Sequence, residues 1–328
     1  MTAERRPVLV APDSFKGTLT ATEVAEAIGQ GLADEGVQTD LMPLADGGEG
    51  TLDVLLGALG GETVKVEAHD ALGRPVTARI GVTGDGTAIV ETAQAIGLPL
   101  IDEAERDAEA ASSYGAGELI CAAAATGASR IIVAVGGSAT TDGGAGALEA
   151  IDAGGGIGDA RLVVCCDART AFEDAAVVFG PQKGADPATV ERLTARLRQQ
   201  ARELPRDPSG MPMTGAAGGL AGALWAAHDA ELVGGAAFVL DALDADARMR
   251  AARAVVVGEG RLDPTTLEGK AVGELAVRAR QAGVPAHAVV GEDALDLLDR
   301  RILDLHAVIE AGTKRQLRAA GRKLAEYL

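Results

Sequence analysis

The sequence predicts an α/β protein with two domains, one of which is a discontinuous, flavodoxin-like domain with a doubly wound parallel sheet. The first observation is that short apolar stretches alternate with helical patterns at both ends of the chain. The second is a length of 328 residues, which is more than one hydrophobic core usually serves. The third is a middle part that alternates apolar and polar residues around turn signals, as antiparallel hairpins do. We therefore expect a second, inserted α/β domain with a mixed sheet.

The amino-terminal part reads as two strands, each followed by a helix. An apolar stretch at 8–11 leads through the turn PDSFKG into a helix whose start is marked by a capping box, Thr20 with Glu23. A second strand, DLMPLA at 40–45, ends in DGGEG, and the leucines that follow have helical spacing. The chain thus alternates strand and helix twice by about residue 60.

The carboxyl-terminal part continues the same alternation. The apolar runs AVVVGEG, AHAVVGE and AVIEAG alternate with helical patterns, so both ends together supply the strands of one flavodoxin-like sheet. Between them, LGRP and GDG mark antiparallel hairpins, and further strands and helices follow. We assign residues 1–61 and 252–328 to the flavodoxin-like domain and residues 62–251 to the inserted domain.

Composition restricts the partners and the compartment. A formal charge of -18 disfavours nucleic acid and anionic membranes, which bind basic surfaces. Three cysteines without a CxxC or disulfide pattern indicate a reducing compartment, and four histidines show no metal-ligand spacing. No apolar run is long enough to cross a bilayer, and MTAERRP lacks the apolar segment of a secretory signal. We therefore expect a cytoplasmic protein.

The candidate site residues gather in turns rich in glycine and acid that follow apolar strands. Glycine lets main-chain N–H groups approach a phosphate closely, and carboxylates can orient a hydroxyl or hold a cation. In DGGEG, Asp46 and Glu49 are separated as in a capping box, so this turn could also serve only to start a helix. Because the chain is strongly acidic, a lysine or arginine inside such a turn is a stronger candidate for binding an anion. The candidates are Asp13 and Lys16; Asp46, Gly47, Gly48 and Glu49; Gly136, Gly137, Ser138, Thr140, Thr141, Asp142, Gly143 and Gly144; Lys183; Arg261, Asp263 and Lys270.

The usual nucleotide motifs are absent or weak. Lys270 follows a glycine, but no P-loop forms around it because Ala271 comes next and no glycine stands at the required offset. GEGRLD begins as a dinucleotide fingerprint but has Asp263 in place of the third glycine. The motifs alone therefore indicate phosphoryl chemistry on a small molecule without fixing the substrate.

Seven segments together resemble the glycerate kinase type I family, the ATP-dependent bacterial glycerate kinases. In chain order they are VLVAPDSFKGTLTATEVAEAIGQGL, PLADGGEGT, SSYGAGELI, VAVGGSATTDGGAG, FGPQKGA, GAAGGLAGAL and GEGRLDPTTLEGK. The resemblance spans nearly the whole chain. It implies two α/β domains and transfer of a phosphoryl group from MgATP to D-glycerate, commonly at the 2-hydroxyl. Between GGAGALEA and VVCCDA this chain has only IDAGGGIGDARL, where the family usually carries several dozen residues.

Under this resemblance the cofactors are ATP and Mg²⁺, and the residues receive provisional roles. Lys16 and Arg261 bind the glycerate carboxylate or the transferring phosphoryl group, and Asp46 or Asp142 meets the hydroxyl. Asp142 or Asp263 holds Mg²⁺. The residues assigned to glycerate are Asp13, Lys16, Asp46, Gly47, Gly48, Glu49 and Arg261. Those assigned to the phosphates of ATP are Gly136, Gly137, Ser138, Thr140, Thr141, Gly143, Gly144, Lys183 and Lys270.

Two other functions fit the same motifs. One is a non-catalytic sensor that binds phosphoglycerate through these turns, and the other is a kinase for another small hydroxy acid. The protein partner expected is a second copy of the chain, in a homodimer.

Overall fold

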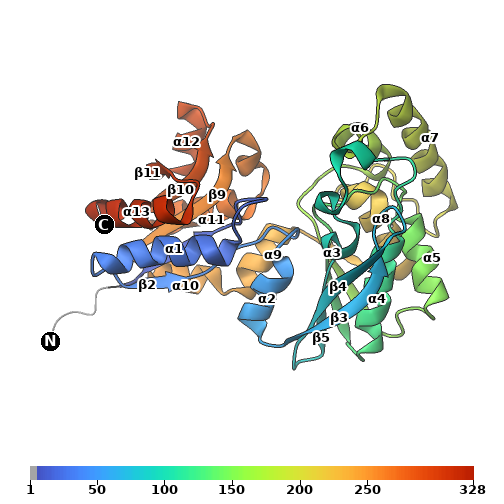
Figure 1. Ribbon diagram of the computed structural model, residues 1–328, viewed down its shortest axis with the longest axis horizontal. Helices are drawn as coiled ribbons and strands as arrows, with labels where there is room; N and C mark the ends of the chain where they lie inside the picture. Colours follow the sequence, from blue (N-terminus) through green and yellow to red (C-terminus); the bar gives the residue numbers. More distant parts are fainter. Residues whose placement is uncertain (1–5) are drawn as a thin grey trace. The chain divides into compact units, whose positions relative to one another are not determined.

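The computed structural model describes residues 6 to 328, apart from the side chains of Glu268 and Leu297. The expectation of a chain without a secretory signal rests largely on its first five residues, which lie outside this range. The described chain divides into two compact units (Figure 1). Unit 1 is made of the chain up to Asp46 and of Ala236–Leu328, and unit 2 is made of Gly47–Gly235.

Unit 1 contains a five-stranded sheet in the order β11-β10-β9-β1-β2, in which every pair is parallel. Numbered along the chain, this order is 2-1-3-4-5, which is the flavodoxin-like order and confirms the predicted fold. The strands are β1 (Val8–Pro12), β2 (Thr39–Leu41), β9 (Ala254–Leu262), β10 (Ala286–Asp293) and β11 (Leu305–Glu310). The helices are α1 (Ala21–Asp34), α9 (Gly235–Ala242), α10 (Ala245–Ala251), α11 (Ala271–Ala282), α12 (Leu297–Leu303) and α13 (Lys314–Leu324), with 3₁₀ turns η6 (Pro264–Glu268) and η7 (Ala325–Tyr327).

The second strand of this sheet is shorter than DLMPLA suggested. β2 ends at Leu41, although the main-chain N–H groups of Met42 and Leu44 still bond to carbonyls of β1. Pro43 lies between them at a position that faces away from β1, and its missing N–H is tolerated there because β2 is an edge strand. The chain nevertheless runs beside β1 as far as Leu44, so Asp46 follows close to the point where β1 ends.

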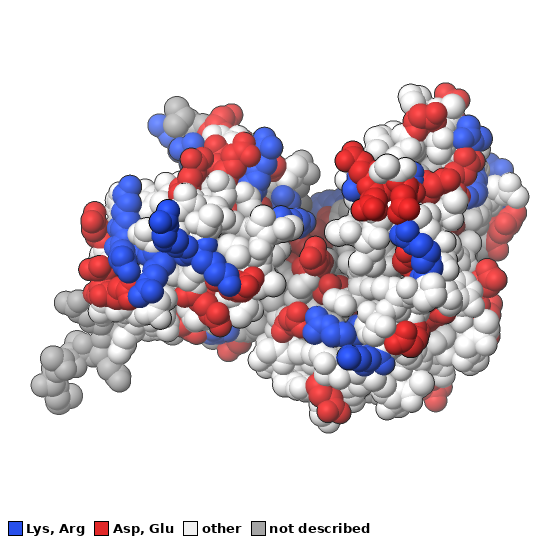
Figure 2. All heavy atoms as spheres, in the orientation of Figure 1, with Lys and Arg blue, Asp and Glu red and all other residues white. Residues whose placement is uncertain are grey.

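Helices α1 and α13 pack closely on each other because glycine faces main chain at their contact. A Cβ atom on Gly31 would meet the Arg318 carbonyl, and one on Gly321 would meet the Ile28 carbonyl. Basic side chains gather over these helices in the charge view (Figure 2). Arg318 and Arg322 both pair with Asp34 of α1, at 2.7 and 2.8 Å. This basic area is therefore largely an ion-pair network between two helices.

Unit 2 contains a six-stranded sheet in the order β3-β4-β5-β6-β7-β8. The first three strands are antiparallel neighbours and the rest pair in parallel, which confirms the expected mixed sheet. The strands are β3 (Glu62–His69), β4 (Pro75–Val82), β5 (Thr87–Glu91), β6 (Arg130–Ala134), β7 (Arg161–Cys165) and β8 (Glu231–Val233). The helices are α2 (Thr51–Leu59), α3 (Ala93–Ile96), α4 (Tyr114–Ala125), α5 (Ala145–Ala153), α6 (Ala175–Phe179), α7 (Pro187–Glu203) and α8 (Leu220–His228). The 3₁₀ turns are η1 (Leu98–Leu100), η2 (Glu103–Glu105), η3 (Phe172–Asp174), η4 (Pro181–Lys183) and η5 (Ala216–Gly219).

The boundaries of the compact units differ from the expected 61/62 and 251/252 because three helices pack elsewhere, one of them α9, which lies in unit 1 from Ala236 on. Helix α2 lies against the unit 2 sheet: a Cβ atom on Gly81 of β4 would be 2.8 Å from the Leu52 side chain. Helix α10 lies in unit 1, where Arg248 pairs with Asp40 of β2 at 2.6 Å. Helical periodicity shows that such helices have an apolar face, but it does not show which sheet that face covers.

Candidate functional site

The carboxyl edge of the unit 1 sheet, meaning the edge at which its parallel strands end, carries several predicted site residues. The chain leaves β1 for β2 on one side, and β9 lies on the other side of β1, so the topological switch point falls between β1 and β9. Open α/β sheets bind their ligands in the crevice at such a point. The predicted residues near this edge are Asp13 after β1, Lys16 in the next turn, Asp46 after β2, Arg261 in β9, Asp263 after β9 and Lys270 before α11.

Asp13 is a buried carboxylic acid held directly at this switch point. Its main-chain N–H donates to the Gly258 carbonyl of β9 at 2.7 Å, and its Oδ1 accepts the Ser14 N–H at 2.6 Å. Burial raises the pKa of Asp13 to about 7, and the negative charge of Asp46 raises it as well, against the lowering effects of Ser14 and Lys16. A carboxyl group that titrates near neutral pH is suited to accept a proton.

Glu259, in the same GEGRLD segment as Arg261 and Asp263, is a second buried acid at this edge. Its Oε1 accepts the Thr266 hydroxyl at 2.7 Å, and its Oε2 lies 3.6 Å from the Lys270 ammonium. Burial raises the pKa of Glu259, while Thr266 and Lys270 lower it. Lys270, predicted for the phosphates of ATP, is thus engaged by a carboxylate of unit 1.

Arg261 forms ion pairs at this edge, yet 60% of its side chain is exposed. Its Nε lies 3.8 Å from Asp263 and its guanidinium lies 3.7 Å from Glu292, so both ion pairs are long. Asp263 begins the turn η6, where its Oδ1 accepts the N–H and hydroxyl of Thr265 at 2.9 and 2.5 Å. The Thr265 hydroxyl bond is the main reason that the pKa of Asp263 is lowered. Arg261 therefore retains donors for an incoming anion, whereas Asp263 is engaged by its own turn.

The glycine loop of unit 2, residues 136–144, follows β6 and contains the residues predicted to hold phosphates. Gly137, Gly143 and Gly144 have φ of 78°, 67° and 75°, in the left-handed region that favours glycine. Within residues 6–328, no acceptor bonds the main-chain N–H groups of Gly137, Ser138, Thr140 or Thr141. Free amides in a glycine-rich turn are the usual ligands of a phosphate group.

Asp142 organises this loop through its carboxylate. Its Oδ2 accepts the N–H and hydroxyl of Ser113, each at 2.8 Å, and the N–H of Gly146 at 3.2 Å. Its Oδ1 accepts the Gly144 N–H at 3.2 Å. The Ser113 hydroxyl in turn accepts the Ala147 N–H at 3.0 Å. The acid predicted as base or metal ligand is thus occupied in joining the starts of α4 and α5 to the glycine loop.

Lys183 supports the same loop from below its surface. The side chain is buried, and its ammonium donates to the Thr140 carbonyl at 2.5 Å and to the Ser138 hydroxyl at 3.3 Å. Burial lowers the pKa of Lys183 to about 8, against the raising effect of Asp142. The structure therefore brings Lys183 together with the glycine loop, and its bonds within the chain go to the loop itself.

The DGGEG turn packs its glycines against main chain in unit 2. A Cβ atom on Gly47 would be 3.0 Å from the Cys165 carbonyl, and one on Gly136 would be 2.7 Å from the Gly48 Cα. Helix α2 begins after Gly50, whose φ is 89°, and neither Asp46 nor Glu49 caps it. The alternative of a capping box is therefore wrong.

Glu91 performs the capping that was attributed to DGGEG. This buried acid ends β5, and its Oε2 accepts the N–H groups of Gly50 and Leu52 at 3.0 and 3.1 Å. Burial raises the pKa of Glu91, and the hydrogen bond from Leu52 lowers it. Glu91 was not among the residues predicted from the sequence, although an acid closing the apolar run TAIVE was a usable signal.

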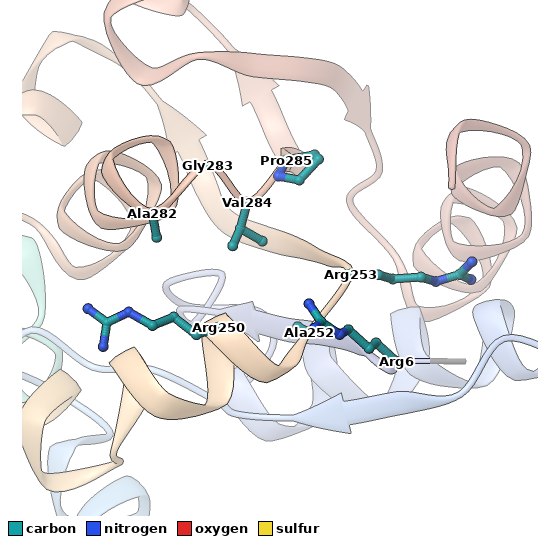
Figure 3. A pocket seen from close by; sticks show the side chains of 8 residues that line it. All are labelled: Arg6, Arg250, Ala252, Arg253, Ala282, Gly283, Val284 and Pro285. Atoms are coloured by element: carbon teal, nitrogen blue, oxygen red, sulfur yellow. The ribbon is translucent and has the colours of Figure 1, made fainter. Parts of the chain in front are cut away.

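A hollow of about 410 Å³ lies at the opposite edge of the unit 1 sheet, where the strands begin (Figure 3). Arg6, Arg250 and Arg253 line it together with Ala252 and residues 282–285. Figure 3 shows the side chains of Arg250 and Arg253 pointing away from each other. They do not converge on one anion, and the hollow contains none of the acids that the proposed chemistry needs.

The acids assigned to Mg²⁺ do not form a metal centre of their own. Among residues 6–328, no group of three or more histidine, cysteine, aspartate or glutamate side chains is placed to hold a metal ion. Asp142 and Asp263 lie in different units, and hydrogen bonds engage both carboxylates.

Among residues 6–328, no helix combines the length and the apolar character needed to cross a bilayer.

The fold and these strand-end turns define a two-unit α/β protein that presents acids and cations on one unit and a phosphate-type glycine loop on the other. The sequence profile of the "Glycerate kinase family" matches residues 8–156 and 154–326. The chain belongs to this family. The two matched segments meet at the short connection between α5 and β7.

Individual relatives cover nearly the whole chain. A glycerate kinase of Halalkalibacterium halodurans is 36% identical over 369 aligned positions, covering 97% of both chains. A glycerate 2-kinase of Escherichia coli is 35% identical and covers 87% of this chain and 84% of its own. The crystal structure of a putative glycerate kinase 2 from Salmonella typhimurium LT2 superposes with a TM-score of 0.82 at 34% identity, covering 99% of this chain and 98% of its own.

Proposed function

We propose that this chain is a glycerate kinase that transfers the γ-phosphoryl group of ATP to a hydroxyl of D-glycerate, with 2-phosphoglycerate as the product. The observation that carries the proposal is family membership over the whole chain together with the intact strand-end turns. The name of the E. coli relative, glycerate 2-kinase, favours the 2-hydroxyl as the acceptor.

In this proposal the acceptor acid binds at the carboxyl edge of unit 1. Lys16 and Arg261 are both exposed there, and a cation beside a small carboxylate supplies charge-assisted hydrogen bonds. Asp13 and Asp46 follow neighbouring strands and are the acids offered to the hydroxyl. Phosphoryl transfer asks mainly for positioning and neutralisation of charge, which these groups provide without covalent chemistry.

The glycine loop of unit 2 is the proposed ligand of the nucleotide phosphates. Its free N–H groups at Gly137, Ser138, Thr140 and Thr141 are donors that a phosphate can accept. Lys183 adds a positive charge beneath the same loop. Among the residues described, the loop thus combines amides and a cation in one unit.

Mg²⁺ is expected to enter with the nucleotide. The assigned carboxylates do not fit a protein-held ion, because Asp142 Oδ2 already accepts three hydrogen bonds and Asp263 Oδ1 accepts two. Mg²⁺ usually keeps several waters and takes much of its coordination from phosphate oxygens. Its chemistry is to neutralise charge on the β- and γ-phosphates.

The test is ATP consumption by the purified chain with D-glycerate, hydroxypyruvate, tartronate and erythronate. Turnover with D-glycerate well above the others supports the proposal, and ³¹P NMR of the product distinguishes 2- from 3-phosphoglycerate. Preference for another acid would support the second kinase function. Binding of phosphoglycerate without turnover of any acid would favour the sensor.

We further propose that the protein works in the reducing cytoplasm as a homodimer. Cys121, Cys165 and Cys166 are all free thiols, and burial is the largest cause that raises the pKa of each, so they are poorly reactive. Sedimentation of the full chain tests the dimer.

A further inference from the structure

The carboxylates near the glycine-rich turns differ in how many of their oxygen atoms are already in use. Asp142 accepts hydrogen bonds at both oxygens, and so does Glu91. Glu259 is bonded to Thr266 and paired with Lys270. The carboxylate oxygens of these acids already hold the turns in place. If one of them accepted a proton from a substrate, it would lose some of these contacts.

Asp13 is the buried acid at the switch point that keeps an oxygen free. Its Oδ1 accepts the N–H of the adjacent Ser14, and within the described chain no donor bonds its Oδ2. The Asp13 N–H to the Gly258 carbonyl fixes the main chain beside β9, so the carboxylate has a defined place. A base needs both a free lone pair and a fixed position within hydrogen-bond reach of the proton.

The charges around Asp13 come from three segments. Asp46 follows β2, Lys16 lies in the turn after β1, and Glu259 lies in β9. Asp46 and Glu259 disfavour the negative charge on Asp13, and Lys16 favours it. The net result, with burial, is a pKa of about 7, so ionised Asp13 is both populated and basic at neutral pH.

Resting on the proposed function, we infer that Asp13 is the catalytic base of the transfer. Its free carboxylate oxygen takes the proton from the glycerate hydroxyl as that oxygen bonds to the γ-phosphorus atom of ATP. The bond from the γ-phosphorus to the β–γ bridging oxygen breaks, and its electron pair leaves with ADP. Asp13 ends protonated and returns the proton to water after product release. Asp46 is a positioning residue that acts on the basicity of Asp13.

The decisive experiment compares the pH dependence of kcat/KM for D-glycerate at saturating MgATP in wild type, Asp13→Asn, Asp13→Glu and Asp46→Asn. The wild type should lose activity on the acid side with a midpoint near 7. Asp13→Asn should lower kcat by about 10²–10⁴-fold and lack that acid limb. Asp13→Glu should recover part of the kcat lost in Asp13→Asn and should again lose activity on the acid side. Asp46→Asn should move the midpoint to lower pH, whatever it does to the rate.

A readout without turnover keeps the inference separate from the proposed function. ¹³C NMR of carboxyl-labelled aspartate should show one resonance with a midpoint near 7 that is missing in Asp13→Asn. Turnover of Asp13→Asn within threefold of wild type, with the same acid limb, overturns the base assignment alone. Absence of turnover by the wild type with every acid overturns the proposed function and the assignment together, even if the resonance titrates as expected.

Discussion

Replacing Lys183 by methionine is expected to change how the stability of unit 2 depends on pH. The lysine is buried, and its ammonium bonds to the Thr140 carbonyl and the Ser138 hydroxyl. Methionine has a similar length and fills the same space without a charge. The substitution therefore removes a buried ionisable group while leaving much of the packing.

The magnitude follows from the pKa of Lys183, which burial lowers from 10.5 to about 8. Each tenfold change in proton affinity between the folded and unfolded chain corresponds to about 1.4 kcal/mol, so charging Lys183 costs the folded state about 3 kcal/mol at neutral pH. This cost is absent above about pH 10.5, grows as the pH falls from 10.5 to about 8, and is fully present below about 8. The wild type should accordingly gain about 2 kcal/mol on the variant between about pH 8 and pH 10.

The assay is urea unfolding of both proteins at several pH values in this range, followed in the transition that includes the glycine loop. In the difference between the two unfolding free energies, the contributions of the titrating groups that both proteins share cancel. Lys65→Met, which removes an exposed lysine of β3 in the same unit, is the matched control and should give a flat difference. A difference for Lys183→Met that is equally flat would refute the conclusion that the lysine is desolvated.

Three further substitutions test other parts of the account. Asp13→Asn should have an unfolding free energy up to about 4 kcal/mol higher than wild type above pH 7 and little higher near pH 4. The reason is that the pKa of Asp13 is raised in the folded chain, so the wild type loses stability as the pH rises. A difference in urea unfolding that does not change with pH would contradict this. Glu91→Ala should cost about 2–4 kcal/mol, since it leaves one buried and one partly buried N–H group unbonded, whereas Glu91→Gln should cost less than half as much in the same assay. Gly219→Ala should cost about 2–4 kcal/mol because its Cβ atom would lie 2.7 Å from the Gly143 Cα, whereas Gly210→Ala, with open space and a φ of 71°, should cost only about 1 kcal/mol; equal losses would show that the contact with the glycine loop is unimportant.

Local patterns predicted the elements that depend on neighbouring residues. The capping box of Thr20 and Glu23 forms as expected, because both partners lie within one helical turn. Asp186, which caps α7 through the Thr189 N–H, likewise lies within one helical turn of its partner. Alternating strands and helices likewise sufficed for the flavodoxin-like order, since parallel crossovers leave few arrangements.

Contacts between distant segments could not be predicted in this way. Glu91 caps α2 from a strand 41 residues away, so its role follows only from the packing of α2 on the unit 2 sheet. Lys183 was assigned to phosphates because it stands in a glycine turn, yet burial turns its bonds toward Thr140 and Ser138. Asp142 likewise looked available in sequence but accepts donors from Ser113, which lies before α4.

Calorimetric titration with D-glycerate measures whether the acceptor acid binds at the carboxyl edge of unit 1. Arg261→Ala removes a cation from that edge, and Arg250→Ala removes one from the hollow at the opposite edge. We expect Arg261→Ala to weaken D-glycerate binding by about tenfold or more and Arg250→Ala to leave it unchanged. Weaker binding in Arg250→Ala with unchanged binding in Arg261→Ala would contradict this expectation.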